Sequence, residues 1–240
     1  MEILDNAKIV DLGLWFPDLK TLAISDLHIG YEEALNRQGI MIPRHQVSDT
    51  IERLKKILAI TGKLDKIIIN GDLKHEFGTV NKEEFFGVRD ILGLLKKNCE
   101  ELFILEGNHD KILGYTKDKA TVRKHLLVSN ILFAHGDEIL SNLDSADAKI
   151  IVIGHAHPAV KLSDGIAAEK VKCFLKGKYW TKTLIALPSF NLVTEGTDIV
   201  NEETLSPYLD NVSNFEVFAV PNFNEILYFG KIKNIKQLAQ

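Results

Sequence analysis

The chain has 240 residues, a formal net charge of −4 and a pI of about 6.1, which argues against a protein that coats nucleic acid by bulk positive charge. No apolar run reaches the roughly 20 residues that cross a bilayer, and no basic segment followed by an apolar one opens the chain, so we expect neither membrane insertion nor secretion. The two cysteines, Cys99 and Cys173, form no CxxC pair. We therefore predict a single cytoplasmic domain over residues 1–240, with both cysteines as small core residues.

The first half of the chain alternates apolar runs of strand length with helical periodicity. Residues 1–19 predict an edge strand or hairpin. Strands are predicted at 21–25, 67–69 and 102–105, and helices at 31–38, from Pro43 to Gly62, and at 82–97. This alternation indicates the βαβ units of an α/β sheet.

The second half is richer in short strands. Apolar runs predict strands at 131–134 and 150–153, and later ones at 170–176, 181–187, 215–220 and 225–231. The later strands indicate a second sheet, largely antiparallel. Between them, residues 195–214 are acidic and predict a solvated excursion.

Polar motifs follow five of these predicted strands. The carboxyl ends of parallel strands are where ligands and metals collect. The motifs are Asp26-Leu27-His28, Gly71-Asp72, Gly107-Asn108-His109-Asp110, His135-Gly136-Asp137 and Gly154-His155-Ala156-His157. Each motif alone is most often an ordinary turn, but burying so many ionisable groups together would be costly without metal.

The motifs supply carboxylates, imidazoles and one amide oxygen, and no thiolate. The candidate metal ligands are Asp26, His28, Asp72, Asn108, His135, His155 and His157. This set favours two divalent ions, most readily manganese, with iron, zinc or nickel as alternatives. On an extended segment alternate residues face one side, so Asp26 and His28 can both reach one ion. The same period places His155 and His157 on one side, with the small Ala156 between them. Asp72 is the natural bridging ligand, because Gly71 allows close backbone approach.

The five motifs, in this order over roughly residues 20–160, resemble those of the calcineurin-like metallophosphoesterase superfamily. The resemblance implies an α/β fold, a four-layer α/β/β/α sandwich of two mixed sheets flanked by helices, with a dinuclear centre. It places Asp26, His28, Asp72 and His157 on one ion, and Asp72, Asn108, His135 and His155 on the other. It also implies that His109 is the catalytic histidine that contacts the phosphate or the leaving oxygen.

The segment after Gly71-Asp72 discriminates within this superfamily. Phosphoprotein phosphatases carry Gly-Asp-x-x-Asp-Arg-Gly, whereas this chain has Leu73-Lys74-His75-Glu76. A histidine at that position resembles the SbcD-like DNA-repair nucleases and their smaller archaeal and bacterial relatives, some encoded beside DNA ligases or helicases. The segment 187–191 is loosely similar to the same group. The resemblance implies a DNA-repair helicase or ligase as a partner, although the chain lacks a sizeable capping domain.

The expected mechanism uses both ions. Two ions about 3.5–4 Å apart would lower the pKa of a bridging water and present hydroxide to a phosphorus atom. His109 would stabilise the pentavalent species or protonate the leaving oxygen. Asp110 would hold the other ring nitrogen of His109 or simply form the turn. His75 would be a second phosphate contact or leaving-group donor, or an exposed loop histidine.

The substrate is predicted to be a phosphodiester, because the motifs contain no phosphatase-type arginine. In residues 170–176 lysines alternate with apolar side chains, so the lysines share one face of the predicted strand. Lys172, Lys176 and the nearby Trp180 are therefore predicted to contact single-stranded DNA. The alternative is that this strand simply faces solvent. We therefore predict a manganese-dependent phosphodiesterase that acts as a nuclease or end-processing enzyme in DNA repair. The alternatives are a small-molecule phosphatase or nucleotide pyrophosphatase, and a non-catalytic interaction module, which the complete ligand set disfavours. The sequence leaves the oligomeric state open.

Overall fold

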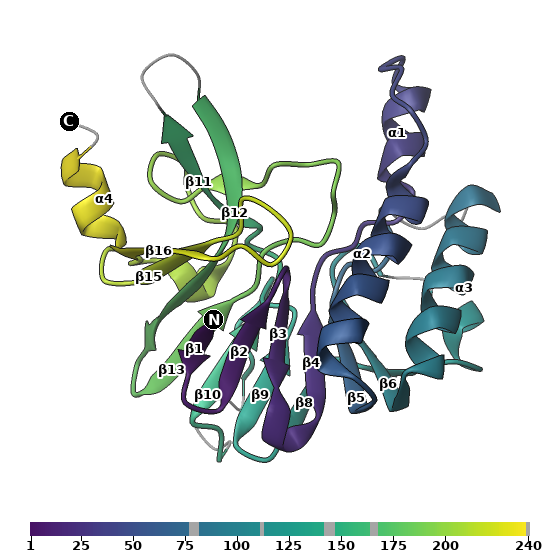
Figure 1. Cartoon of the computed structure of the whole chain (residues 1–240), viewed down its shortest axis with the longest axis horizontal. Coiled ribbons are helices and arrows are strands. Elements are labelled where there is room, and N and C mark those ends of the chain that lie inside the picture. The colour runs from purple at the N-terminus through teal and green to yellow at the C-terminus, as the bar shows by residue number, and fades with distance from the viewer. Residues whose placement is uncertain (77–81, 111–112, 142–146, 164–167, 239–240) are drawn as a thin grey trace.

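The computed structural model describes residues 1–76, 82–110, 113–141, 147–163 and 168–238, which form two mixed β-sheets flanked by helices (Figure 1). The sheets pack face to face, and the rings of Phe16 and Phe133, one from each sheet, meet edge to face at 5.9 Å. The predicted α/β sandwich of two mixed sheets is confirmed. Both cysteines are buried and free. None of the helices in the described ranges is long and apolar enough to cross a membrane.

The first sheet has seven strands in sequence order. They are β1 (Glu2–Leu4), β2 (Ala7–Val10), β3 (Gly13–Phe16), β4 (Thr21–Ile24), β5 (Leu64–Asn70), β6 (Cys99–Leu105) and β7 (Thr121–Arg123). The strands β1 to β4 pair antiparallel, which extends the predicted hairpin, and β4 to β7 pair parallel. The predicted βαβ alternation is therefore confirmed.

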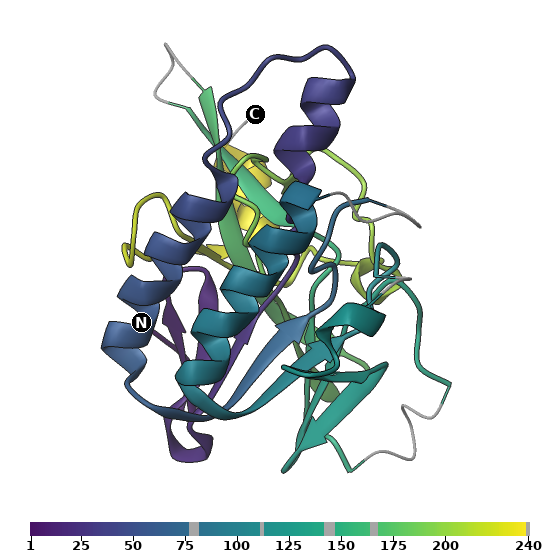
Figure 2. The same cartoon turned by 90° about the vertical axis from the view of Figure 1, so that its right-hand side faces the viewer.

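Helices α2 (Gln46–Thr61) and α3 (Lys82–Lys97) lie side by side over the outer face of this sheet (Figure 2). The apolar stripe of α2 buries Leu54, Ile57 and Leu58 against the sheet. This helix begins at Gln46 rather than at Pro43, and Gly62 ends it as expected. The shorter α1 (Tyr31–Arg37) precedes α2, and 3-10 turns lie at Pro17–Leu19 and Gly114–Thr116.

The second sheet has nine strands. They are β8 (His125–Val128), β9 (Ile131–Ala134), β10 (Ile150–Ile153), β11 (Pro158–Ser163), β12 (Ala168–Tyr179), β13 (Lys182–Ala186), β14 (Thr197–Asp198), β15 (Glu216–Ala219) and β16 (Leu227–Lys231). The order is β14-β11-β12-β13-β10-β9-β8, with β15 on β12 and β16 on β15. Antiparallel pairs predominate as predicted, but β9, β10 and β13 are mutually parallel.

The outer face of the second sheet is covered by a thin layer. It consists of the segment 199–215, with a 3-10 turn at Pro207–Leu209, and of the short α4 (Ile232–Leu238). The prediction of a solvated excursion at 195–214 is wrong here, because Ile199, Tyr208 and Leu209 are buried against the sheet. The burial of their apolar surface stabilises this packing more than the surrounding acidic side chains disfavour it.

The strand registers bring the predicted ligands to one edge of the molecule. Ile24 pairs with Ile69 and Ile69 with Ile104, so β4, β5 and β6 end level with one another. In the second sheet Ala134 pairs with Ile153, so β9 and β10 also end level. The Asn70 side chain at the end of β5 donates a hydrogen bond of 2.9 Å to the carbonyl of Ala134, which ties the two sheets together at this edge.

Candidate metal centre

The backbone at the strand ends turns sharply. The φ angles of five predicted ligands are positive, namely Asp26 (54°), His28 (45°), Asp72 (46°), His155 (62°) and His157 (45°). This differs from the extended segments that we expected. Left-handed turns rather than strand alternation direct these ligands toward the site, while the intervening Leu27 and Ala156 are buried in the core.

Two glycines make the close packing of these turns feasible. A Cβ atom on Gly71, whose φ is +90°, would lie 1.9 Å from Nδ1 of His135. A Cβ atom on Gly107 would lie 2.1 Å from Oδ1 of Asp72. Only glycine therefore fits at these two positions.

The first group of candidate ligands is Asp26, His28 and His157, whose ligand atoms lie within 4.8 Å of one another. Nε2 of His28 and Nε2 of His157 are 3.3 Å apart, and Nε2 of His157 lies 3.5 Å from Oδ1 of Asp26. The other carboxylate oxygen of Asp26 accepts hydrogen bonds from the Ser25 hydroxyl and the His155 amide. Oδ1 of Asp26 is buried without a hydrogen-bond partner in the described structure.

The second group is Asp72, His135 and His155. Nε2 of His135 lies 3.1 Å from Oδ1 of Asn108, 3.2 Å from Nδ1 of His155 and 3.5 Å from Oδ2 of Asp72. The amide oxygen of Asn108 therefore lies with this group, to which the family resemblance assigned it.

One oxygen of Asp72 belongs to both groups. Its Oδ2 atom lies 3.6 Å from Nε2 of His28 and 3.5 Å from Nε2 of His135, whereas Oδ1 accepts a hydrogen bond from the His109 amide. Metal–ligand bonds of about 2.0–2.2 Å give ligand–ligand separations of about 3–3.6 Å. The separations quoted above fall in that range, and all ligand atoms within each group lie within 4.8 Å of one another, so the residues fit two cations that share Asp72.

The electrostatics of the site also suit cations. Although burial acts to raise the pKa of Asp26, the neighbouring histidines hold it below its usual range. Burial and the proximity of His157 lower the pKa of His28 to about 3, which leaves a neutral ring. Burial lowers the pKa of His135, but Asp72 and Asp26 outweigh it and raise that pKa to about 9. A cation bound at His135 must therefore displace a proton.

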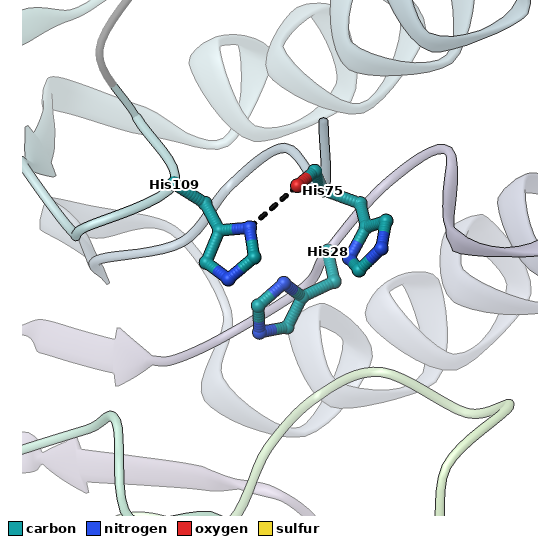
Figure 3. A group of neighbouring side chains, drawn as sticks. All are labelled: His28, His75 and His109. Carbon is teal, nitrogen blue, oxygen red and sulfur yellow. Dashed lines mark hydrogen bonds between the residues drawn. The ribbon is translucent and has the colours of Figure 1, made fainter. Parts of the chain in front are cut away.

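His75 and His109 lie beside His28 of the first group (Figure 3), and the ring nitrogens of these three histidines come within 4.8 Å of one another. Their rings stack with centroids 5.3 Å apart, and the ring of Tyr31 packs against His75 at 4.6 Å. Nδ1 of His109 donates a hydrogen bond to the backbone carbonyl of His75. This contact fixes the tautomer of His109, because a carbonyl can only accept.

Asp110 does not hold the His109 ring. Its buried carboxylate accepts hydrogen bonds from the backbone amides of Leu73, Lys74 and Gly107. The carbonyl of His75, and not the carboxylate of Asp110, accepts the hydrogen bond from Nδ1 of His109. Of the two roles considered for Asp110, the structure shows the structural one: it joins the Asn108 turn to the Asp72 turn.

An open pocket of about 490 Å³, here called the catalytic pocket, lies beside these histidines. Its lining consists of His28, His75, His109, His157, Tyr31, Asn191 and the segment 194–197. Among the residues that the structure describes, this lining contains neither arginine nor lysine. The pocket therefore offers imidazoles and hydroxyls to a substrate rather than permanent cations.

Several residues that support the site were not among the site residues predicted from the sequence. Ser189 donates a hydrogen bond to the carbonyl of Asp26, and the amide of Asn191 donates to the same carbonyl. Gln46 bridges the carbonyl of His28 and the side chain of Asn191. The loose similarity of 187–191 to the smaller phosphoesterases was the available signal for Ser189 and Asn191.

The predicted substrate track is not continuous. The amine of Lys176 pairs with Glu216 at 2.6 Å, and it also donates to the carbonyl of Ile3. Trp180, 71% exposed, lies in the turn between β12 and β13. Because Thr183 pairs with Ile150, that turn lies at the amino end of β10, away from the ligand edge. Lys172 alone of the three lies near the site, as described below.

A family model for the calcineurin-like phosphoesterases matches residues 19–193, a range that includes every candidate metal ligand. The chain belongs to the calcineurin-like phosphoesterase family. This membership and the two ligand groups support a metal-dependent phosphoesterase. No curated protein matches the chain by sequence.

A solved nuclease structure shares this fold over nearly the whole chain. The nuclease MPE of Pseudomonas putida has a TM-score of 0.64 and 18% identity, over 92% of this chain and 94% of that one. The phosphoesterase Yfce of E. coli is less similar, with a TM-score of 0.42 and 13% identity over 86% of this chain and 96% of that one. Vacuolar protein sorting 29 of Cryptosporidium parvum has a TM-score of 0.41 and 15% identity over 88% of this chain and 97% of that one.

Proposed function

We propose that the protein is a dinuclear metal-dependent phosphodiesterase that cleaves DNA, as a nuclease or end-processing enzyme. The observation that carries the proposal is the position of Oδ2 of Asp72, within 3.6 Å of a histidine in each ligand group. Bound divalent ions, for which we propose manganese, would supply an activated water and neutralise charge on the phosphate.

The residues of the chain would divide the remaining tasks. The hydrogen bond from Nδ1 of His109 to the carbonyl of His75 orients the ring beside the catalytic pocket. His109 would then donate a proton or hydrogen bond to the departing oxygen, a role that typically contributes about 10²–10⁴ in rate. His75, which lines the same pocket, would contact a non-bridging oxygen.

Two observations favour a diester over a monoester. The described residues that line the catalytic pocket include no arginine or lysine, and a monoester dianion gains more from such cations than a diester monoanion does. The structural neighbour with a TM-score of 0.64 is described as a nuclease, and it shares the fold over nearly the whole of both chains. A role in DNA repair, with a ligase or helicase as partner, extends this proposal.

The test uses purified protein with bis-p-nitrophenyl phosphate, p-nitrophenyl phosphate and single-stranded DNA, each with and without manganese. We expect manganese-dependent cleavage of the diester and of DNA, and loss of both activities in His109→Ala. Absence of cleavage in metal-loaded protein would refute the proposal. Preference for monoesters or nucleotides by orders of magnitude would replace it with a phosphatase or nucleotide pyrophosphatase.

A further inference from the structure

A second pocket lies next to the catalytic pocket. It has a volume of about 250 Å³ and is bounded by α2, by the amino-terminal half of β12 and by residues 192–195. Arg53, Lys170, Lys172, Thr194 and Glu195 are among its lining residues, and we call it the lysine pocket. Because Thr194 and Glu195 also line the catalytic pocket, the two pockets share a wall.

Two polar atoms of the lysine pocket are buried without a hydrogen-bond partner in the described structure. They are Nζ of Lys172 and Oγ1 of Thr194. Buried polar groups are nearly always paired, so each unpaired group calls for an explanation such as a ligand. An ammonium and a hydroxyl together match the oxygen atoms of an anion.

The other cations of this pocket already have counter-ions. Arg53 makes a two-pronged contact with buried Asp11, at 2.6 and 2.8 Å. Lys170 pairs with Glu202 at 2.6 Å. Lys172 makes no ion pair in the described part of the chain, and burial, followed by the charge of Arg53, lowers its pKa to about 7. A lysine kept in this costly state is expected to meet an anion.

The sheet geometry explains how this lysine reaches the site. Val171, Cys173 and Leu175 pack in the core on the outer face of the second sheet, whereas Phe174 packs between the two sheets. By strand alternation Lys172 shares the face of Phe174. The amine of Lys172 therefore points between the sheets, beside the segment that walls the catalytic pocket.

We propose that the lysine pocket is a subsite for a second phosphate group of the substrate, adjacent to the phosphodiester that lies at the metal centre. This inference rests on the proposed phosphodiesterase function and narrows its substrate class. The preferred substrates are nucleotide chains with a phosphate beside the scissile one, either at a terminus or in the next internucleotide link.

The test compares three thymidylate substrates: TpT with one phosphate, pTpT with a terminal second phosphate, and TpTpT with an internucleotide one. We expect wild-type kcat/KM to be about tenfold or more higher for pTpT or TpTpT than for TpT, since a charge-assisted hydrogen bond contributes about that much. A gain for pTpT alone identifies a terminal phosphate, and a gain for TpTpT alone identifies an internucleotide one.

The matched variants are Lys172→Met and Lys176→Met, two lysines on the same strand, of which Lys176 is paired with Glu216. Lys172→Met should abolish the preference for a second phosphate, Lys172→Arg should restore part of it, and Lys176→Met should keep the wild-type ratio. Equal wild-type efficiency on all three substrates, or an unchanged ratio in Lys172→Met, would overturn the inference.

A binding experiment separates this inference from the proposed function. Calorimetry with thymidine 3′,5′-bisphosphate in EDTA should show binding to wild-type protein and at least tenfold weaker binding to Lys172→Met and Thr194→Val. If no diester is cleaved but these differences appear, the phosphodiesterase proposal fails and the anion subsite stands. If diesters are cleaved and the bisphosphate binds wild type and variants alike, or binds neither, the subsite is refuted.

Discussion

Replacing Lys172 by methionine is expected to make the ligand-free protein more stable at neutral pH, although it weakens phosphate binding. Methionine keeps the length of the side chain and removes a buried charge that has no partner. The pKa of Lys172 falls from 10.5 to about 7, a drop of about 3.5, which at about 1.36 kcal/mol per pKa unit is about 5 kcal/mol. Because the flexible side chain can swing its amine toward water, we expect a gain of about 1–3 kcal/mol.

The pH dependence of this gain has a definite sign. Below pH 7 lysine is charged in both folded and unfolded protein, so the full penalty applies. Between pH 7 and 10.5 the unfolded chain binds more protons than the folded one, so wild-type stability rises with pH relative to the variant. The charged groups that act on the amine are Arg53, which lowers the pKa, and Asp26 and Glu195, which raise it.

The assay is urea unfolding of both proteins in EDTA at pH 6.5, 8 and 9.5. The stability difference should be largest at pH 6.5 and should shrink steadily as the pH rises. Lys176→Met is the control, and it should lose stability or leave it unchanged because its amine is paired with Glu216. A less stable Lys172→Met protein, or a difference that does not change with pH, would refute the picture of a buried, unpaired amine.

Four further changes test the metal centre. His109→Ala should bind metal as wild type does, by elemental analysis, and lose about 10²–10⁴ in turnover; loss of metal would make His109 a ligand. Asp72→Asn should weaken both metal sites in calorimetric titration, and two normal sites would refute its bridging role. Gly107→Ala should lower both the melting temperature and the metal content, because its Cβ meets Asp72, whereas Gly93→Ala in α3 should raise stability by about 0.5–1 kcal/mol. Chelation by EDTA should lower the melting temperature and leave the far-UV circular dichroism unchanged, and unfolding on chelation would show that the metal holds the fold together.

The sequence predicted the parts of the site that depend on chain order. Buried strands such as 67–69 are recognisable from β-branched runs, and the parallel register then places Asp72 and Asn108 side by side. Periodicity also grouped Lys172 with Lys176 correctly, but it cannot say which face of a strand another layer will cover. The lysine face lies toward the first sheet, so the amine of Lys172 is buried although the residue as a whole is half-buried. The prediction that Trp180 lies beside the substrate was wrong for a related reason. Proximity to Lys176 along the sequence does not tell which end of the sheet a turn occupies.

The backbone turns indicate that contacts within the protein, and not the bound ions, fix the positions of the metal ligands. Each left-handed residue costs about 1 kcal/mol or more, and such conformations persist only where other contacts fix them. Here the contacts join one ligand turn to another: the amides of Asp26 and His28 donate to the carbonyls of Gly71 and Asp72, and the His155 amide donates to the Asp26 carboxylate. Because these bonds use backbone amides and the second oxygen of Asp26, the ligand atoms stay oriented when no cation is bound. Side-chain changes such as Asp72→Asn should therefore alter metal binding while these turns persist.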